Sequence, residues 1–346
     1  MASDMRVTLT QFLIEARRHY PHATGDFNSL LLNVALVCKR IARKVAAGAL
    51  HGGLVEKTLG EVGNELFIEG NNWGAYLAGM SSKDREQPCQ IPDCYARGRY
   101  LLVFDPLDGS SNLDVNGAVG SIFSVLRSPD SSRPVTEQDF LQPGAELVAS
   151  GYAIYGPATM LVLTVGSGVN GFTLCPQLGE FMLTHPNLSI PPDTQEFAIN
   201  ASNSRFWEQP VRRYVNECMA GRAGQRGKDF SMRWIASMVA EAHRILMRGG
   251  VFLYPRDAQG PAMQGHVRLL HEANPIGFLI EQAGGRASTG RQPVRSVKPS
   301  SLHQRIGLVF GSRNEVDLIE RYHTSSLVED LPNPLFSERS LFRNPA

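Results

Sequence analysis

The chain has 346 residues, of which 42% are hydrophobic and 19% are charged, a composition typical of a globular protein of about two domains. Its 34 Lys and Arg residues nearly balance 33 Asp and Glu residues, and the formal net charge of +1 argues against a protein that binds nucleic acid or a membrane surface. No run reaches the ~18 apolar residues of a membrane helix and the N-terminus does not resemble a signal peptide, so we expect a soluble, cytoplasmic protein whose five scattered cysteines are reduced.

The N-terminal part of the chain predicts two helices. Apolar residues recur at three- and four-residue steps over residues 30–45, which indicates an amphipathic helix. We expect Asp26 to cap the start of this helix and the pair Gly52-Gly53 to close it. A shorter helical pattern follows over residues 61–68.

A series of strands comes next. The sequence YLLVF at residues 100–104 is a continuous apolar run that suits a strand buried on both faces, and we expect Asp105-Pro106 to end it. Further strands are predicted at residues 121–126, 147–154, 160–165, 171–174 and 181–183. Strands that follow one another without intervening helices indicate a largely antiparallel or mixed sheet.

The last part of the chain alternates between helices and short strands. Helices are predicted at residues 209–219, 232–247 and 276–283, and strands at residues 251–253 and 306–310. Glycine pairs at 249–250 and 284–285 follow two of these helices, and glycine is the expected residue just past a helix end.

The change of pattern near residues 191–195 also predicts a domain boundary. We expect an N-terminal domain of residues 1–193 and a C-terminal domain of residues 194–323. Residues 324–346 are rich in Ser, Pro and Asn, which predicts a mobile tail.

The stretch FDPLDGSSN at residues 104–112 carries the most chemistry. Asp105 and Asp108 leave the end of a buried strand, and their carboxylates and the turn carbonyl of Leu107 can supply the hard oxygen ligands that Mg²⁺ prefers. The following Gly109-Ser110-Ser111 offers backbone N–H groups and hydroxyls suited to phosphate oxygens. The alternative interpretation is a plain surface turn, since each of these residue types favours turns.

The same stretch resembles the metal-binding motif of the fructose-bisphosphatase and inositol-monophosphatase superfamily. The chain continues with LDVN at residues 113–116 and GSIF at residues 120–123, which is similar to class 1 fructose-1,6-bisphosphatases, especially those of Calvin-cycle bacteria. The resemblance covers nearly the whole chain. It implies an α/β fold, the layered αβαβα sandwich of the sugar phosphatases with mixed sheets, and assembly as a homotetramer.

The resemblance also implies a metal and catalytic site. Glu272, within HEANP at residues 271–275, matches the glutamate that completes the metal site of the family, although from the residues alone it would be an acid before a helix. The implied ligands of Mg²⁺ or Mn²⁺ are Asp84, Asp105, Leu107, Asp108 and Glu272. The implied catalytic residues are Asp84, Asp105, Asp108 and Glu61, of which Asp84 or Glu61 is the candidate base.

Contacts to a sugar bisphosphate are implied for a further set of residues. These are Asp108, Gly109, Ser110, Ser111, Asn200, Arg233, Met238, Tyr254 and His266. The family arginine reaches into the active site of a neighbouring subunit, so Arg233 implies an oligomer, and a guanidinium suits a phosphate dianion. Without the resemblance, Arg233 would be a solvated arginine, Tyr254 a capping aromatic and Met238 a core residue. Thr24-Gly25-Asp26 and Arg99-Tyr100 correspond to the AMP-inhibition pocket of family members.

Three departures from the family pattern concern the metal site, the lid and the sugar pocket. Relatives carry Ser-Glu-Glu where this chain has Ser81-Ser82-Lys83-Asp84, and we expect Lys83 to turn out to solvent, which leaves one metal poorly held. Gly60 stands at the position of a lid-loop aspartate in a shortened loop, which should lower turnover. His266 replaces the lysine that binds the second phosphate, and His271 replaces a tyrosine; an ordinary histidine is only partly charged at neutral pH.

We therefore predict a phosphatase that hydrolyses the 1-phosphate of fructose 1,6-bisphosphate to fructose 6-phosphate and phosphate, with a metal-bound water as nucleophile, in gluconeogenesis or the Calvin cycle. One alternative is the same chemistry on sedoheptulose 1,7-bisphosphate. Another is a catalytically impaired paralogue that acts as a ligand sensor or subunit, which the changes at Lys83 and Gly60 motivate.

Overall fold

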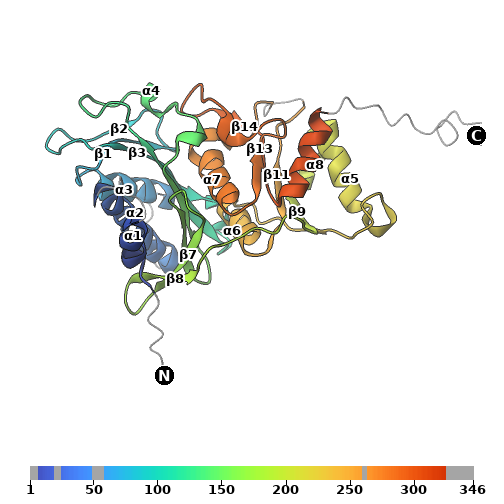
Figure 1. The fold of residues 1–346 in the computed structure, drawn as a ribbon, viewed down its shortest axis with the longest axis horizontal. Coiled ribbons are helices and arrows are strands. Elements are labelled where there is room, and N and C mark those ends of the chain that lie inside the picture. The colour runs from blue at the N-terminus through green and yellow to red at the C-terminus, as the bar shows by residue number, and fades with distance from the viewer. Residues whose placement is uncertain (1–6, 19–24, 49–57, 259–262, 325–346) are drawn as a thin grey trace, which may run out of the picture.

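Helices and sheets alternate in five layers (Figure 1), and a hydrophobic core fills the space between neighbouring layers. The computed structural model describes residues 7–18, 25–48, 58–258 and 263–324. The predicted αβαβα sandwich with mixed sheets is confirmed.

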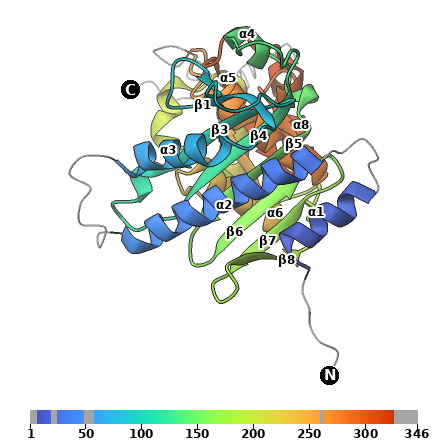
Figure 2. The same cartoon turned by 90° about the vertical axis from the view of Figure 1, so that its left-hand side faces the viewer.

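The first layer consists of three helices, α1 (Leu9–Arg18), α2 (Gly25–Ala47) and α3 (Leu59–Asn71), which lie across one face of the large sheet (Figure 2). The predicted cap at Asp26 is wrong, because α2 begins at Gly25 and places Asp26 in its first turn. The helix ends at Ala47, before the predicted Gly52-Gly53, and those glycines lie outside the described residues.

The second layer is an eight-stranded sheet in the order β2-β1-β3-β4-β5-β6-β7-β8. Only β1 and β3 run parallel, and all other neighbouring strands are antiparallel, so the prediction of a mixed sheet is confirmed. The strands are β1 (Leu77–Ser82), β2 (Cys89–Gln90), β3 (Tyr100–Asp108), β4 (Val119–Arg127), β5 (Ala149–Tyr155), β6 (Thr159–Thr164), β7 (Asn170–Cys175) and β8 (Glu180–His185).

Strand β3 does not end at Asp105-Pro106 as predicted. It continues to Asp108, because the chain accommodates the proline in a bulge rather than in a turn. Proline is tolerated at such a point since a bulge leaves its position out of the regular hydrogen-bond ladder.

The middle layer contains α6 (Met238–Arg248) and α7 (Asn274–Gln282), whose apolar side chains pack between the two sheets. The predicted start of α6 at residue 232 is wrong: the side chain of Ser237 accepts a hydrogen bond from the amide of Ala240 and caps the helix there. The predicted glycine stop is confirmed, since Gly249 has a φ of 82° and donates to the carbonyl of Ile245 at 2.8 Å. A π-helical turn, Leu269–Ala273, leads into α7.

The fourth layer is a five-stranded sheet in the order β10-β9-β11-β15-β13, and α5 (Gln209–Met219) and α8 (Arg313–Thr324) cover its outer face. The predicted strand at residues 306–310 is split into two strands of different sheets, β14 and β15. The strands are β9 (Glu196–Ile199), β10 (Ser231–Met232), β11 (Val251–Tyr254), β12 (Val267–Arg268), β13 (Arg286–Ser288), β14 (Arg305–Ile306) and β15 (Leu308–Gly311). Short helical turns are α4 (Glu137–Phe140) and the 3₁₀ segments Ser110–Asn112, Gly144–Glu146, Ala201–Phe206, Gly221–Ala223 and Val294–Ser296.

All five cysteines are free thiols. Among the residues that the structure describes, no helix combines the length and the apolar character that crossing a membrane requires. Of the predicted tail, all but Thr324 lies outside the described residues.

One titratable group is held between the large sheet and the middle helices. His243 of α6 shares a hydrogen bond of 2.9 Å between its Nδ1 and the hydroxyl of the buried Tyr152 on β5. Burial and, to a smaller extent, the neighbouring His185 lower the pKa of His243 from 6.5 to about 4. The unfolded chain therefore binds a proton at this histidine near pH 6.5, while the folded chain resists protonation until about pH 4. The contribution of His243 to stability is complete above pH 6.5 and is lost as the pH falls toward 4.

We expect a His243→Gln variant to lose less stability than the wild type on acidification. The variant lacks the imidazole, which takes up a proton in the unfolded chain but not in the folded chain between pH 6.5 and pH 4. Between pH 7 and pH 5 the difference should be about 1–2 kcal/mol, measured by urea unfolding at both pH values. A Tyr152→Phe variant is the control: it keeps the buried imidazole and should be less stable at both pH values with an unchanged pH dependence. Equal pH dependence in the wild type and the glutamine variant would contradict this assignment.

Candidate active site

A bulge in β3 brings two acidic residues together at the edge of the middle layer. Asp105 pairs with Ile122 of β4 and Asp108 with Gly120, so Pro106 and Leu107 stand opposite a single residue, Ser121. The hydroxyl of Ser121 donates to the carbonyl oxygen of Pro106 at 2.7 Å and lies 2.8 Å from the hydroxyl of Tyr155. The bulge is therefore held from behind by two buried hydroxyl groups.

The N-terminus of α6 holds Asp108. Its Oδ2 accepts hydrogen bonds from the hydroxyl of Ser237 at 2.7 Å and from the amide of Val239 at 2.9 Å. A carboxylate in this position also benefits from the positive end of the helix dipole. The chain then turns at Gly109, whose φ of 72° is in the left-handed region that favours glycine.

Glu272 completes a group of three buried carboxylates. It lies in the π-helical turn before α7, where its Oε2 accepts a hydrogen bond from the amide of Arg268 at 2.7 Å. One oxygen each from Asp105, Asp108 and Glu272 lie within 4.8 Å of one another. Three hard oxygen donors at this separation fit a divalent cation. We call these three residues the carboxylate cluster.

The predicted orientation of Lys83 toward solvent is wrong. Its Nζ lies 2.6 Å from Oδ2 of Asp105 and 3.0 Å from Oε1 of Glu272, and its side chain is 24% exposed. The register of the sheet explains this orientation: Ser82 of β1 pairs with Phe104 of β3, and the amide of Lys83 donates to the Phe104 carbonyl. Lys83 therefore follows β1 directly beside Asp105, on the same side of the sheet.

The charges in the cluster are strongly coupled. Burial alone would lower the pKa of Lys83, but the neighbouring Asp105, Glu272 and Asp108 outweigh burial and raise it. Burial raises the pKa of Asp105 and of Asp108, and the Lys83 ammonium offsets this only in part. The hydrogen bonds from Val239 and Ser237 further favour the charged form of Asp108. Lys83 is therefore a cation that the buried carboxylates require.

A cleft of about 970 Å³ opens in front of the cluster. Its lining includes Lys83, Asp105, Leu107 and Ser110, and also Gly60 and both candidate bases, Asp84 and Glu61. Asp84 is exposed and lies outside the carboxylate cluster. The carboxylate of Glu61 accepts hydrogen bonds from the amide and hydroxyl of Thr58 at 2.6 and 3.0 Å, which form the capping box of α3.

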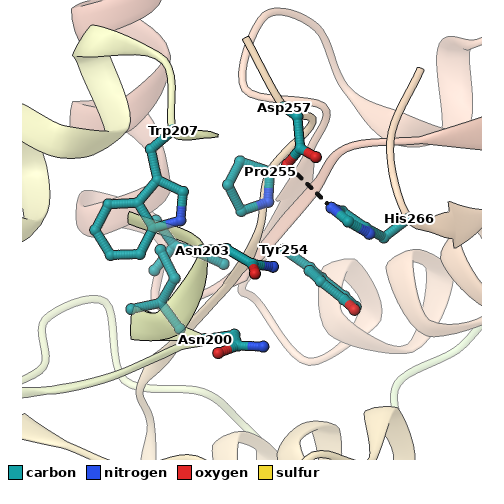
Figure 3. Close-up of a pocket in the computed structure, with 9 residues that line it drawn as sticks. Asn200, Asn203, Trp207, Tyr254, Pro255, Asp257 and His266 are labelled. Carbon is teal, nitrogen blue, oxygen red and sulfur yellow. Dashed lines mark hydrogen bonds and ion pairs between the residues drawn. The ribbon is translucent and has the colours of Figure 1, made fainter. Parts of the chain in front are cut away.

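A second, smaller pocket lies at the end of β11 (Figure 3) and brings together Asn200, Tyr254 and His266. The rings of Tyr254 and His266 stack with their centres 4.5 Å apart. Among the other residues of this pocket, Asn203, Trp207 and Asp257 carry polar groups that were not predicted. Asp257 is 6% exposed and its Oδ1 lies 3.2 Å from Nε2 of His266. The available signal in the sequence was a carboxylate two positions after Pro255, just past a residue expected to bind the sugar phosphate, Tyr254.

The small pocket and the carboxylate cluster influence each other electrostatically. Burial is the main cause of the raised pKa of Tyr254, and the negative charges of Glu272 and Asp257 raise it further. His266 of the pocket stands two positions before Arg268, whose amide donates to Glu272 of the cluster, so the two sites are neighbours. A ligand with a phosphate at the cluster could therefore place its other end in the pocket.

The remaining predicted site residues lie elsewhere. Arg233 is exposed and forms a 3.6 Å ion pair with Glu196, and Met238 is 6% exposed within the core of the middle layer. Ser111 is exposed beside Ser110 in the 3₁₀ turn.

The remaining predicted positions are His271 and the five residues that correspond to an AMP pocket. His271 is fully buried, bonds Ser81 at 3.0 Å, and burial lowers its pKa well below the usual range. Of the residues that correspond to an AMP pocket, Thr24 lies outside the described residues, Gly25 and Asp26 begin α2, Arg99 is exposed and Tyr100 is buried.

Two family models match the chain. The N-terminal domain of fructose-1-6-bisphosphatase matches residues 7–186, and the C-terminal domain of fructose-1-6-bisphosphatase matches residues 190–324. A class 1 fructose-1,6-bisphosphatase of Hydrogenophilus thermoluteolus is 61% identical over 97% of both chains. A second relative, fructose-1,6-bisphosphatase class 1 3 of Methylibium petroleiphilum, is 58% identical over 99% of both chains.

Solved structures agree with these matches. The crystal structure of Leishmania major fructose-1,6-bisphosphatase in holo form is 37% identical, with a TM-score of 0.85 over 92% of this chain and 100% of that chain. The structure of the same protein in the T-state has the same TM-score over 99% of its chain.

We expect a Gly109→Ala variant to disturb the cluster through Asp108. A Cβ at Gly109 would lie 2.8 Å from the Cβ of Ser237, so the cap that holds Asp108 must move. The loss of stability should be about 2–3 kcal/mol, of which about 1 kcal/mol comes from the left-handed backbone. Urea unfolding and Mn²⁺ titration would measure the two effects.

Gly179→Ala is the matched control for that variant. Gly179 has a similar φ of 64°, but a Cβ there would meet nothing within 4 Å. It should lose only the backbone contribution of about 1 kcal/mol and bind Mn²⁺ as the wild type does. Equal losses at both glycines would contradict a role for Gly109 in placing Asp108.

Proposed function

This chain belongs to the class 1 fructose-1,6-bisphosphatase family, and we propose that it hydrolyses the 1-phosphate of fructose 1,6-bisphosphate to fructose 6-phosphate and phosphate. The observation that carries the proposal is the pairing of the carboxylate cluster with the neighbouring pocket of Asn200, Tyr254 and His266. A substrate with a phosphate at each end fits two adjoining sites of this kind.

Asp105, Asp108 and Glu272 would hold a divalent cation, with the Leu107 carbonyl beside them. When bound, such a cation acts as a Lewis acid that polarises the phosphoryl group and acidifies water. The hydroxyl of Ser110 and the amides of the turn after Gly109 orient the phosphate at the mouth of the cleft.

Hydrolysis forms a bond from the water oxygen to phosphorus, breaks the bond from phosphorus to the sugar oxygen, and delivers a proton to that oxygen. Asp84 is the better placed of the two candidate bases. It is exposed at the cleft, whereas the Glu61 carboxylate is engaged in the capping box of α3. Asp84 accepts the proton of the attacking water, and a solvent molecule in the open cleft can protonate the leaving sugar.

The small pocket orients the sugar. Tyr254 offers an apolar ring face and a hydroxyl, Asn200 offers an amide, and His266 lies beside them (Figure 3). In this proposal His266 faces the second phosphate. The partner of His266 is Asp257, whose negative charge opposes a phosphate at the same place. This arrangement favours weaker binding of the second phosphate than a free cation would give.

We further propose Mg²⁺ as the metal, a homotetramer as the assembly and the cytoplasm as the location, with a role in gluconeogenesis or the Calvin cycle. The exposure of Arg233, with only a 3.6 Å ion pair to Glu196, suits an arginine that serves the site of a neighbouring subunit. The near-zero formal net charge suits a protein without a nucleic-acid or membrane partner.

We expect the purified protein to release phosphate from fructose 1,6-bisphosphate only with Mg²⁺, and an Asp108→Asn variant to lose activity by about 10³-fold, because a ligand of the metal is lost. Asp93→Asn, at a side chain that is 99% exposed, is the control and should retain full activity. A folded protein that releases no phosphate from this sugar or from sedoheptulose 1,7-bisphosphate would contradict the proposal and favour a ligand sensor.

We expect a His266→Lys variant to have a several-fold lower KM for fructose 1,6-bisphosphate at pH 8 with an unchanged kcat, because an ammonium stays charged and offsets Asp257. Steady-state kinetics would measure both parameters. His185→Lys adds the same charge on β8, outside the pocket, and should leave KM unchanged. A KM that is equal in the wild type and the His266 variant would place the second phosphate elsewhere.

A further inference from the structure

Lys83 places its ammonium between two members of the carboxylate cluster. Its ammonium lies 2.6 Å from an oxygen of Asp105 and 3.0 Å from an oxygen of Glu272, so it bridges two of the three carboxylates. The backbone fixes its approach, since the amide of Lys83 is bonded to the carbonyl of Phe104, the residue before Asp105. The pairing of β1 with β3 therefore fixes the position of this bridge.

The net charge of the cluster and Lys83 matches that of one additional divalent cation. In the ionised form that binds a metal, the three carboxylates carry three negative charges, and the Lys83 ammonium compensates one of them. The remaining two negative charges match one divalent ion. A second divalent ion would reverse the sign of the cluster and would have to share Asp105 or Glu272 with the ammonium, which like-charge repulsion opposes.

The remaining donors leave room for that one ion. Asp108 is held by α6 through its Oδ2, and the Leu107 carbonyl belongs to the same bulge. The ammonium approaches instead from the side of β1 and bridges Asp105 to Glu272. The ammonium thus occupies the side of the cluster between Asp105 and Glu272, and the side of Asp108 and the Leu107 carbonyl is left for an exchangeable ion.

We infer that Lys83 is a built-in cation that replaces a metal ion, so that this chain binds one divalent cation per protomer at the carboxylate cluster. The inference rests on the cluster being the metal site of the proposed function. It concerns the number and affinity of bound ions, which are measured without substrate. Failure of the phosphatase assay would therefore leave it standing, and a wrong stoichiometry would leave the phosphatase proposal standing.

The experiment is a titration of the full chain with Mn²⁺, followed by the EPR signal of the free ion and by calorimetry. We expect one Mn²⁺ per wild-type chain, lost in Asp108→Asn, and two in a Lys83→Glu variant, which exchanges the tethered cation for a further carboxylate. Lys44→Glu is the matched control: it makes the same charge change in the lining of the same cleft, outside the cluster, and should still bind one ion.

A Lys83→Met variant tests the inference independently of folding effects in the glutamate variant. It leaves three carboxylates without their ammonium, so we expect at least tenfold tighter Mn²⁺ binding than in the wild type. We also expect a melting temperature that falls in a chelator and is restored by Mg²⁺. Two ions in the wild type, none in the wild type, or equal affinity in the wild type and Lys83→Met would each overturn the inference.

Discussion

Three buried carboxylates within 4.8 Å of one another repel, and the parts of the fold that meet around them offset this repulsion. Each element supplies a different group. The chain after β1 supplies the Lys83 ammonium, α6 presents its N-terminal amide to Asp108, and the turn before α7 supplies an amide to Glu272. Removing any one of these groups would leave a buried charge uncompensated, which is more costly than the loss of the contact alone.

The parts of the site that were predicted are those encoded within a few residues of sequence. The apolar run before Asp105 predicts a buried strand that delivers two acids, because burial on both faces requires continuous apolar residues. Gly249 predicts the end of α6 because the residue that follows a helix commonly takes a positive φ, which glycine adopts without strain. Strands β3 to β8 of the large sheet were likewise recognised one by one from short apolar runs between turn residues, whereas β1 and β2 were not predicted.

The parts that were not predicted depend on contacts between distant segments. The direction of Lys83 follows from the parallel pairing of β1 with β3, and β1 has a mixed sequence, LAGMSS, that does not stand out as a strand. The start of α6 was placed too early because Trp234 continues the apolar pattern. The ring of Trp234 instead stacks on Phe252 of β11. Asp257 meets His266 only because the chain returns to the end of β11.

Because Lys83 is covalently part of the chain, the occupancy of this centre depends less steeply on the concentration of divalent ions. A centre that must capture two exchangeable ions fills with the square of their concentration, whereas a centre with one exchangeable ion and one covalently attached charge fills with the first power. Such a centre stays partly assembled when divalent ions are scarce, because the ammonium beside Asp105 cannot dissociate into the medium. An ammonium in place of a metal ion lowers the Lewis acidity of the centre beside Asp105, since an ammonium can only donate hydrogen bonds to a phosphate oxygen.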